Sequence, residues 1–288
     1  MKDKTIGFIG LGVMGHSMAG HLLDAGYKMQ VYTRSKAKAE DLLARGAKWA
    51  KTVAELAKAS DLVISIVGYP ADVEEIYLGP SGILENAGSG TIAVDMTTSD
   101  PGLACKIWEQ GREKKVGVLD APVSGGDLGA KNATLSIMVG GDEKEFKQAL
   151  PVLEVMGKNI AFQGKAGSGQ HTKMANQIAI AAGMVAMCES LAYAQKSGLD
   201  PEAVLRIIGS GAAGSWSLNN LGPRIINEDD RPGFFIKHFI KDMGIALESA
   251  KSMGLDTPGL DLAYSLYNKM ADQGFEENGT QALYKLFQ

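Results

Sequence analysis

The stretch Thr5-Ile6-Gly7-Phe8-Ile9-Gly10-Leu11-Gly12-Val13-Met14-Gly15 decides the fold of this chain. An apolar run typical of a strand leads directly into a GxGxxG pattern, and helix-forming residues follow. In such a strand–turn–helix unit, Gly10 permits the tight turn, Gly12 lets the backbone approach a pyrophosphate, and Gly15 lets helix and strand pack closely. The pattern therefore predicts phosphate binding for a dinucleotide at Gly10, Leu11, Gly12, Val13, Met14 and Gly15.

Short β-rich runs alternate with amphipathic segments of helical length up to about residue 164. This alternation is typical of βαβ units and predicts an α/β fold with a mainly parallel, doubly wound sheet of the Rossmann type. The predicted strands are Thr5–Gly10, Met29–Thr33, Leu62–Val67, Thr91–Asp95, Val116–Asp120, Leu135–Val139 and Asn159–Phe162. Helices predicted between them include Ser17–Ala25, Lys36–Arg45 and Leu103–Lys114.

After Gly164 the strand-like runs end, and the sequence predicts helices alone. Gly169–Gly198 contains no proline and is rich in Ala, Met, Ile and Gln, so it predicts one long helix. Further helices are predicted at Pro201–Ser210, Leu218–Asn227, Lys241–Met253 and Leu260–Asp272. We expect a dinucleotide-binding Rossmann domain over residues 1–164. The long helix joins it to an all-helical domain for substrate binding and oligomerisation over residues 165–288.

The composition is that of a globular protein, because 45% of the 288 residues are hydrophobic and 22% are charged. A net charge of −4 without a basic stripe argues against a nucleic-acid partner. The chain begins without the apolar segment of a signal peptide. Its longest uncharged apolar run, Ile178–Cys188, is shorter than the roughly 20 residues of a membrane helix. Cys105 and Cys188 lack a CxxC context, and no spacing of His and carboxylates suggests a metal. We expect a cytoplasmic protein without membrane or metal partners.

The end of the second predicted strand bears on cofactor choice. An NAD-specific fold usually has Asp or Glu there, which binds the ribose 2′-hydroxyl. This chain has Thr33-Arg34-Ser35-Lys36 instead. A carboxylate would repel a 2′-phosphate and a guanidinium suits bidentate phosphate contact, so Thr33 and Arg34 favour NADP over NAD, with use of both left open. The alternative is that Arg34 and Lys36 are solvated residues at the start of a helix.

Four motifs, in the same order along the chain, resemble those of the β-hydroxyacid dehydrogenases. The first is the glycine pattern with its continuation to Gly26. Asp120-Ala121-Pro122-Val123-Ser124-Gly125-Gly126 resembles the family's substrate-binding loop. Gly167-Ser168-Gly169-Gln170-His171-Thr172-Lys173 with Asn176 resembles its catalytic helix, and Lys241-Asp242-Met243 resembles the element that closes over the nicotinamide. The nearest branch is the 3-hydroxyisobutyrate dehydrogenases and related semialdehyde reductases; 6-phosphogluconate dehydrogenase is a longer relative.

The resemblance implies that Lys173 is the catalytic acid and base. Hydride transfer between nicotinamide and a carbonyl–alcohol pair leaves proton transfer and orientation to the protein. The ammonium of Lys173 can protonate the carbonyl oxygen during reduction, and its neutral amine can accept the hydroxyl proton during oxidation. Burial or a nearby cation would lower the lysine pKa from about 10.4 toward working pH. The alternative is a surface lysine on a helix.

Substrate binding is predicted at Ser124, Gly125, Gly126, Asn176 and Gln177. A serine hydroxyl followed by exposed amides forms a concave site suited to a carboxylate, although a plain glycine turn is the alternative. Asn176 and Gln177 follow Lys173 by three and four positions, so their amides share its face of a helix. The family often has Asn-Asn here, which leaves open which of the two contacts substrate.

Further cofactor positions are predicted at the carboxyl edge of the sheet, where open α/β folds bind ligands. Thr97 and Thr98 follow a strand that ends there, and the resemblance implies that Thr98 contacts cofactor or substrate. The remaining cofactor positions carried over are Val67, Phe234, Lys241 and Asp242, of which the last three form a nicotinamide-side wall and polar clamp.

The predicted function is the NAD(P)-dependent oxidation of 3-hydroxyisobutyrate to methylmalonate semialdehyde. A reductase of glyoxylate, succinic semialdehyde or tartronate semialdehyde (2-hydroxy-3-oxopropionate) is the alternative, because these substrates share the carboxylate-plus-carbonyl layout. Imine reductases of similar scaffold typically replace the catalytic lysine, so Lys173 argues against that activity. A non-catalytic nucleotide-binding module would require the loss of a catalytic group, and none is lost. Ser124 has no adjacent histidine, which argues against a serine hydrolase.

The predicted long helix also carries a face of small residues at Ala179, Ala182, Gly183 and Ala186. Such a face permits close packing and leaves apolar surface if unpaired, so we expect a homodimer or homotetramer with the helical domain at the interface. Burial within its own subunit is the alternative. Trp216 is expected in the core rather than in the substrate pocket.

Overall fold

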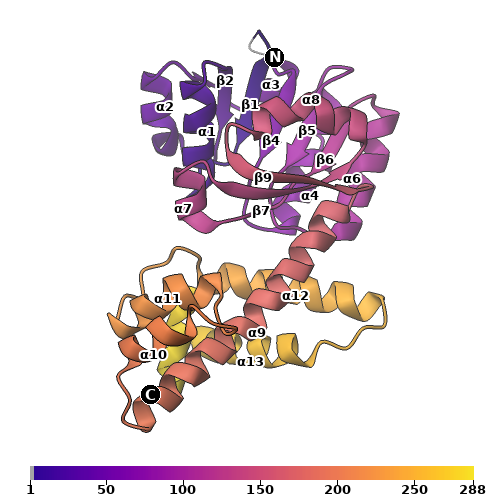
Figure 1. Ribbon diagram of the computed structural model, residues 1–288. Helices are drawn as coiled ribbons and strands as arrows, with labels where there is room; N and C mark the ends of the chain where they lie inside the picture. The colour runs from indigo at the N-terminus through magenta and orange to yellow at the C-terminus, as the bar shows by residue number, and fades with distance from the viewer. Residues whose placement is uncertain (1–2) are drawn as a thin grey trace. The chain divides into compact units, whose positions relative to one another are not determined.

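The computed structural model describes residues 3–288, and the chain divides into two compact units, Met1–Lys173 and Met174–Gln288 (Figure 1). The division falls inside the 29-residue helix α9 (Ser168–Lys196), whose first turns belong to the first unit. The domain boundary predicted between residues 164 and 165 lies just before this helix and stays a prediction.

Nine strands within the described part of the first unit form one sheet in the order β3-β2-β1-β4-β5-β6-β8-β7, with β9 paired to β8. Neighbouring strands from β3 to β6 are parallel, whereas β8 is antiparallel to β6 and β7. The strands are β1 (Thr5–Ile9), β2 (Lys28–Tyr32), β3 (Lys48–Trp49), β4 (Leu62–Ser65), β5 (Ile92–Asp95), β6 (Gly117–Asp120), β7 (Val123–Ser124), β8 (Leu135–Gly141) and β9 (Gly157–Gly164). The predicted Rossmann-type sheet is confirmed.

Both faces of the sheet are buried, and the central strands are mostly apolar. In β1, Ile6 and Phe8 enter one hydrophobic core, and Ile9 enters another on the opposite face. In β4, Ile64 enters the same core as Ile6 and Phe8, and Val63 enters the core on the opposite face. A strand that is apolar on both faces needs helices on both sides, as in doubly wound folds. The helices are α1 (Gly15–Asp24), α2 (Glu40–Ala44), α3 (Val53–Lys58), α4 (Pro70–Leu78), α5 (Ile83–Asn86), α6 (Pro101–Glu113), α7 (Gly126–Lys131) and α8 (Glu143–Leu153), with a 3₁₀ segment at Lys36–Ala39.

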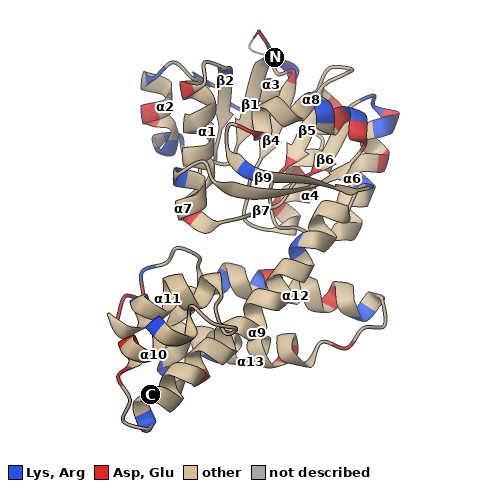
Figure 2. Ribbon diagram, viewed as in Figure 1, with Lys and Arg blue, Asp and Glu red and all other residues tan. Residues whose placement is uncertain are grey.

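Charges of both signs are interspersed on α8, and over the 3₁₀ segment together with α2, at the outer surface of the first unit (Figure 2). In α8, Lys147 Nζ lies 2.8 Å from Glu143 Oε1, one helical turn away. Such exposed pairs contribute little to stability. The first unit is therefore stabilised mainly by its two apolar cores.

The second unit is helical, as predicted. Besides most of α9 it contains α10 (Pro201–Ile208), α11 (Trp216–Ile226), α12 (Ile236–Ser252), α13 (Pro258–Asp272) and a 3₁₀ segment at Thr280–Phe287. The helix predicted from Lys241 begins five residues earlier, at Ile236, whose side chain is completely buried. The prediction for Trp216 was wrong: its side chain is 59% exposed in the first turn of α11, where Ser217, Leu218 and Leu221 point inward instead.

Helix α9 buries one side in the core of the second unit, through Ala181, Met184, Cys188 and Leu191. Within the described residues, α9 is the one helix long and apolar enough to cross a membrane, and its buried apolar residues pack as in a core helix. Of its predicted small-residue face, Ala179, Ala182 and Ala186 are exposed and Gly183 is partly exposed. Burial of that face within its own unit, the alternative weighed from the sequence, is therefore not observed.

Candidate active site

The glycine-rich loop follows β1 and leads into α1. Gly10 has a φ of +96°, and a Cβ there would lie 2.0 Å from the carbonyl oxygen of Ile66. A Cβ on Gly15 would lie 2.0 Å from the carbonyl oxygen of Gly10. A Cβ on Gly12 would meet no atom of the described chain within 4 Å. The fold itself thus requires Gly10 and Gly15, whereas the open space over Gly12 suits a pyrophosphate.

The start of α1 supports the same interpretation. Its N-cap residue, Met14, makes no side-chain capping bond within the described chain. The first amides of a helix need acceptors, and a phosphate at this position supplies them. Leu11 is buried and Val13 is 59% exposed, so the predicted phosphate loop presents one residue to the core and another to solvent. The residues present therefore fit a dinucleotide.

The segment after β2 leaves both interpretations of its cations open. Thr33 is half-buried, and the Arg34 side chain is 87% exposed with Nη1 3.6 Å from Asp72 Oδ1. Lys36 Nζ lies 5.9 Å from the ring centroid of Trp49. The structure adds Asp72, a carboxylate within reach of Arg34 that the sequence analysis did not consider.

Polar side chains join the ends of β4 and β5 at the carboxyl edge of the sheet. Asp95, the last residue of β5, accepts hydrogen bonds from Ser65 Oγ (3.0 Å) and from the amide of Thr97 (3.2 Å). The Thr97 hydroxyl in turn accepts a bond of 3.0 Å from the amide of Val67. The network therefore holds the amide of Val67 and the residue before Thr98; Val67 and Thr98, both predicted at the cofactor, are half-buried.

The carboxylate of Asp120, at the end of β6, binds the beginning of α9. Its Oδ1 accepts from the amide of Gly167 and its Oδ2 from the amide of Gln170, both at 2.8 Å. Burial raises the pKa of Asp120 to about 6, although these amide bonds act to lower it. Burial also raises the pKa of Asp95 to about 6, against the bonds from Thr97 and Ser65, and the Asp120 charge adds to this rise. Two protonatable carboxyls thus lie at adjacent strand ends.

Lys173 lies one turn into α9 and is only 7% exposed. Its Nζ donates a hydrogen bond of 2.8 Å to the carbonyl oxygen of Val123, the residue before Ser124. Gly125 and Gly126 then have φ values of +130° and +63°, which lead the chain into α7. The lysine and the predicted carboxylate-binding loop are therefore joined directly within the first unit.

The predicted residues of the second unit form a chain of hydrogen bonds. Asn176 Nδ2 donates to Gln177 Oε1 (2.8 Å), and Gln177 Nε2 donates to Asp242 Oδ2 (2.7 Å). The other oxygen of Asp242 lies 2.8 Å from Lys241 Nζ. Gln177 is 1% exposed, whereas Asn176 is half-buried. Of the two amides left open by the sequence, Asn176 is the more accessible.

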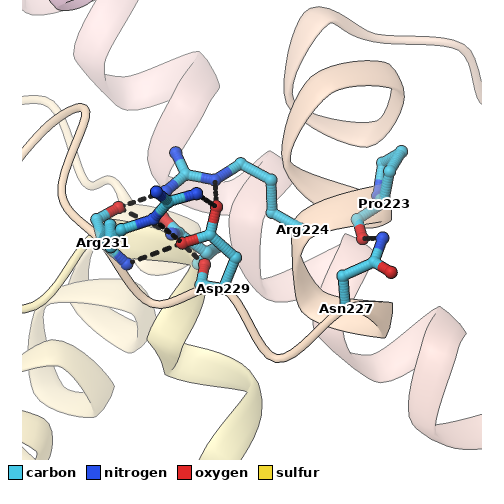
Figure 3. Close-up of polar contacts among 6 residues, drawn as sticks. Pro223, Arg224, Asn227, Asp229 and Arg231 are labelled. Carbon is cyan, nitrogen blue, oxygen red and sulfur yellow. Dashed lines mark hydrogen bonds and ion pairs between the residues drawn. The ribbon is translucent and has the colours of Figure 1, made fainter.

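Phe234 packs against the core of the second unit, with its ring centroid 5.5 Å from that of Phe239. The loop before it is held by Asp229, which binds the guanidinium groups of Arg231 and Arg224 (Figure 3). The bonds from Arg231 and Arg224 hold the pKa of Asp229 below its ordinary value. The amide Nε2 of Gln281 adds a bond of 2.7 Å to the Asp229 carbonyl oxygen. The approach to Phe234 and α12 is therefore fixed by ion pairs and backbone bonds.

Both parts of the chain match known families. Residues 5–164 match the NAD binding domain of 6-phosphogluconate dehydrogenase, and residues 167–287 match the NAD-binding domain of NADP-dependent 3-hydroxyisobutyrate dehydrogenase. The chain belongs to the β-hydroxyacid dehydrogenase family. Both matches are described as NAD-binding parts of dehydrogenases, and this chain is an NAD(P)-binding oxidoreductase.

Individual relatives of the family agree over nearly the whole length. The chain is 49% identical to the probable 3-hydroxyisobutyrate dehydrogenase-like 1 of Arabidopsis thaliana, over 98% of this chain and 84% of the relative. It is 39% identical to the 2-hydroxy-3-oxopropionate reductase of Escherichia coli, over 96% and 95%. The solved structure of Mycobacterium tuberculosis 3-hydroxyisobutyrate dehydrogenase with L-serine has a TM-score of 0.91 and 29% identity, over 99% of each chain.

Three residues that adjoin the predicted site residues of this β-hydroxyacid dehydrogenase were assigned no role from the sequence alone. Asp120 and Gln170 stand inside the quoted motifs, yet no role was given to them, because a cap between distant segments leaves no local pattern. His238 precedes Lys241 by one turn of α12, and burial, Lys241 and Lys237 lower its pKa. The spacing of three residues on a helix was the available signal for His238. No metal-binding cluster of His, Cys, Asp or Glu occurs in residues 3–288.

Gly12→Ala is expected to weaken cofactor binding without destabilising the fold. The added methyl group meets open space in the protein but occupies the approach of the pyrophosphate. The Kd for NADP should rise at least tenfold, about 1.4 kcal/mol, with an unchanged free energy of unfolding in the absence of cofactor. Calorimetric titration and urea denaturation measure the two quantities.

Gly15→Ala is the matched control, because its Cβ would collide with backbone and should lower the free energy of unfolding. An unchanged Kd in Gly12→Ala would show that this loop does not hold the phosphates.

Asp95→Asn is expected to flatten the pH dependence of stability. The folded protein holds the Asp95 proton more tightly than the unfolded chain does. The carboxyl's contribution is therefore fully present below about pH 4 and is lost as the pH rises through about 6. The free energy of unfolding of the variant relative to wild type should rise by up to about 3 kcal/mol from pH 4 to pH 8.

Urea denaturation at both pH values provides the measurement. Asp261→Asn, which changes an exposed carboxylate in the first turn of α13, serves as the control and should show no such rise. Identical behaviour of the two variants would contradict a buried, protonatable Asp95.

Proposed function

We propose that this protein is an NADP-preferring dehydrogenase of a small β-hydroxy acid, with 3-hydroxyisobutyrate as its substrate. The observation that supports this most directly is the 2.8 Å bond from Lys173 Nζ to the carbonyl oxygen of Val123. It joins the proton-transfer group to the loop Ser124-Gly125-Gly126, whose hydroxyl and amides suit a carboxylate. A substrate with a carboxylate and a nearby hydroxyl or carbonyl group fits two such groups at a fixed separation.

In this mechanism each group of the chain has one task. The hydroxyl of Ser124 and the following amides bind the substrate carboxylate, and the nicotinamide, when bound, accepts or supplies the hydride. Neutral Lys173 Nζ accepts the hydroxyl proton during oxidation, and the ammonium returns it to the carbonyl oxygen during reduction. Val123 holds Nζ beside the loop, and burial of the lysine excludes water from the proton transfer.

Asn176 is the amide we assign to the substrate. Asp242 carries Lys241 on one oxygen and can only accept on the other, so Gln177 must direct its NH₂ group there. The carbonyl oxygen of Gln177 then takes the NH₂ group of Asn176. This leaves Asn176 Oδ1 as an acceptor, which suits a hydroxyl donor on the substrate. Gln177 acts by fixing that orientation.

A second substrate, tartronate semialdehyde, is favoured by one observation. The Escherichia coli relative of 39% identity is named for the reduction of 2-hydroxy-3-oxopropionate, the same compound. We place 3-hydroxyisobutyrate first because the Arabidopsis relative of that name is 49% identical and the second unit matches the corresponding family.

A turnover panel tests both substrates and the carboxylate requirement. The methyl ester of 3-hydroxyisobutyrate leaves donors of the loop without an anionic acceptor, so its kcat/KM should be about 10²- to 10⁴-fold below that of the acid. In the same panel Lys173→Ala should lose about 10²- to 10⁴-fold in kcat while still binding NADP. Lys165→Ala, an exposed lysine just before α9, is the matched control.

Equal kcat/KM for acid and ester would contradict the assignment of the loop as a carboxylate-binding site. A Lys173→Ala variant that kept more than about a tenth of the wild-type kcat would contradict the role of the lysine in proton transfer.

The proposed preference for NADP rests on Thr33 in place of an acid and on the exposed guanidinium of Arg34. Arg34→Ala should weaken NADP by about 1.5–3 kcal/mol, the cost of one charge-assisted contact, and NAD much less. Fluorescence titration with both cofactors measures the difference. Lys38→Ala, which removes an exposed cation from the following 3₁₀ segment, is the control. A wild-type kcat/KM that is higher with NAD would contradict the assignment.

We also propose a homodimer or homotetramer formed through the second unit. The exposed small-residue face of α9 supports it, because contiguous apolar surface on a soluble protein is normally covered. Light scattering at micromolar protein should give at least twice the chain mass of 30.4 kDa. A mass equal to one chain would contradict the proposal.

A further inference from the structure

Gln170 is completely buried at the start of α9, and its side chain binds backbone on both sides of Thr98. Its Oε1 accepts a hydrogen bond of 2.9 Å from the amide of Ser99. Its Nε2 donates a bond of 2.8 Å to the carbonyl oxygen of Thr97. Since Thr97 and Ser99 are buried and Thr98 is half-buried, one side chain fixes the backbone from which Thr98 projects.

The backbone of Gln170 is fixed as firmly as its side chain. Its amide donates to Asp120 Oδ2 at 2.8 Å, so the residue is anchored to the end of β6. Lys173 follows three positions later on the same helix and is bonded to Val123. Residues three apart on a helix are neighbours on its surface. Gln170 is therefore a short, rigid connection between Thr98 and Lys173.

The chemistry of the two bonds requires a glutamine. The carbonyl of Thr97 can only accept and the amide of Ser99 can only donate, so the binding side chain needs one donor end and one acceptor end. A carboxylate offers acceptors alone and a thioether offers no donor. The direction of the amide is fixed by its partners.

We infer that Gln170 is a positioning residue, which sets Thr98 on the cofactor side against Lys173 on the substrate side. The inference rests on the proposed function, in which Lys173 transfers the proton, and on the predicted contact of Thr98 with cofactor or substrate. Hydride transfer depends on the alignment of cofactor and substrate, and a misplacement of about 1 Å can cost on the order of 10²-fold in rate. Loss of the Gln170 bonds therefore acts on kcat through the placement of Thr98.

Two variants separate the bonds. Gln170→Met removes both, and Gln170→Glu keeps an acceptor for Ser99 but lacks a donor for Thr97 until the carboxyl is protonated. Hydrogen exchange of the Thr97–Asp100 segment without cofactor should accelerate about tenfold or more in Gln170→Met, because a buried bond is lost. Its kcat should fall about 10- to 100-fold with little change in the Kd for NADP, and the deuterium isotope effect on kcat should increase.

Gln170→Glu provides a readout that loss of stability alone would not produce. Its kcat relative to wild type should recover as the pH falls, because protonation restores the donor to Thr97. Thr91→Val is the control, since it removes a buried side-chain bond of 3.3 Å to the carbonyl of Ser60 at the other end of β5. This variant should lose stability and keep the wild-type kcat and isotope effect.

Lys173→Ala in the same series separates the two claims. If Lys173→Ala loses turnover while Gln170→Met keeps a kcat within about twofold of wild type, the positioning role is wrong and the proposed function stands. If Lys173→Ala retains turnover, the proposed function fails and the positioning role fails with it. An unchanged isotope effect in Gln170→Met, or a Gln170→Glu profile parallel to wild type, also overturns the inference.

Discussion

The candidate active site depends on the hydrogen bonds between the Asp120 carboxylate and the beginning of α9. It ends β6 and takes the amides of Gly167 and Gln170, each at 2.8 Å. A negative charge at a helix N-terminus satisfies amides that have no partner within the helix and interacts favourably with the helix dipole. Because this contact attaches the beginning of α9 to the end of β6, it also determines where Lys173 lies relative to Val123.

This arrangement concentrates polar groups where the fold is otherwise apolar. The strands behind the edge are buried on both faces, yet Asp95 and Asp120 carry carboxyls whose pKa burial raises to about 6. Apolar residues at these positions would give a more stable sheet edge, because burying a charge is unfavourable. The carboxyls orient neighbouring backbone instead: Asp95 binds the segment before Thr98, and Asp120 binds the beginning of the helix that carries Lys173.

In the second unit the Asp242 carboxylate determines the direction of two hydrogen bonds between side chains. Asp242, paired with Lys241, forces Gln177 to donate to it, and Gln177 forces Asn176 to donate in turn. Asp242, in its ion pair with Lys241, can only accept, so the order cannot be reversed without an unpaired group in a buried position. Both units therefore use buried carboxylates to orient residues that are predicted to lie at the active site.

The sequence by itself determined the Rossmann-type sheet and the helical second unit, because periodicity and glycine spacing are local and survive in one dimension. It also determined the family motifs and placed Lys173, Ser124 and Asn176 within them. Only the tertiary structure revealed the bonds of Asp120 and Gln170 and the bond from Gln177 to Asp242, since their partners lie 47 to 73 positions away and leave no local pattern. The exposure of Trp216 was likewise decided by packing: a side chain that is apolar by type is buried only where neighbouring elements cover it, and at the start of α11 the core receives Leu218 and Leu221 instead.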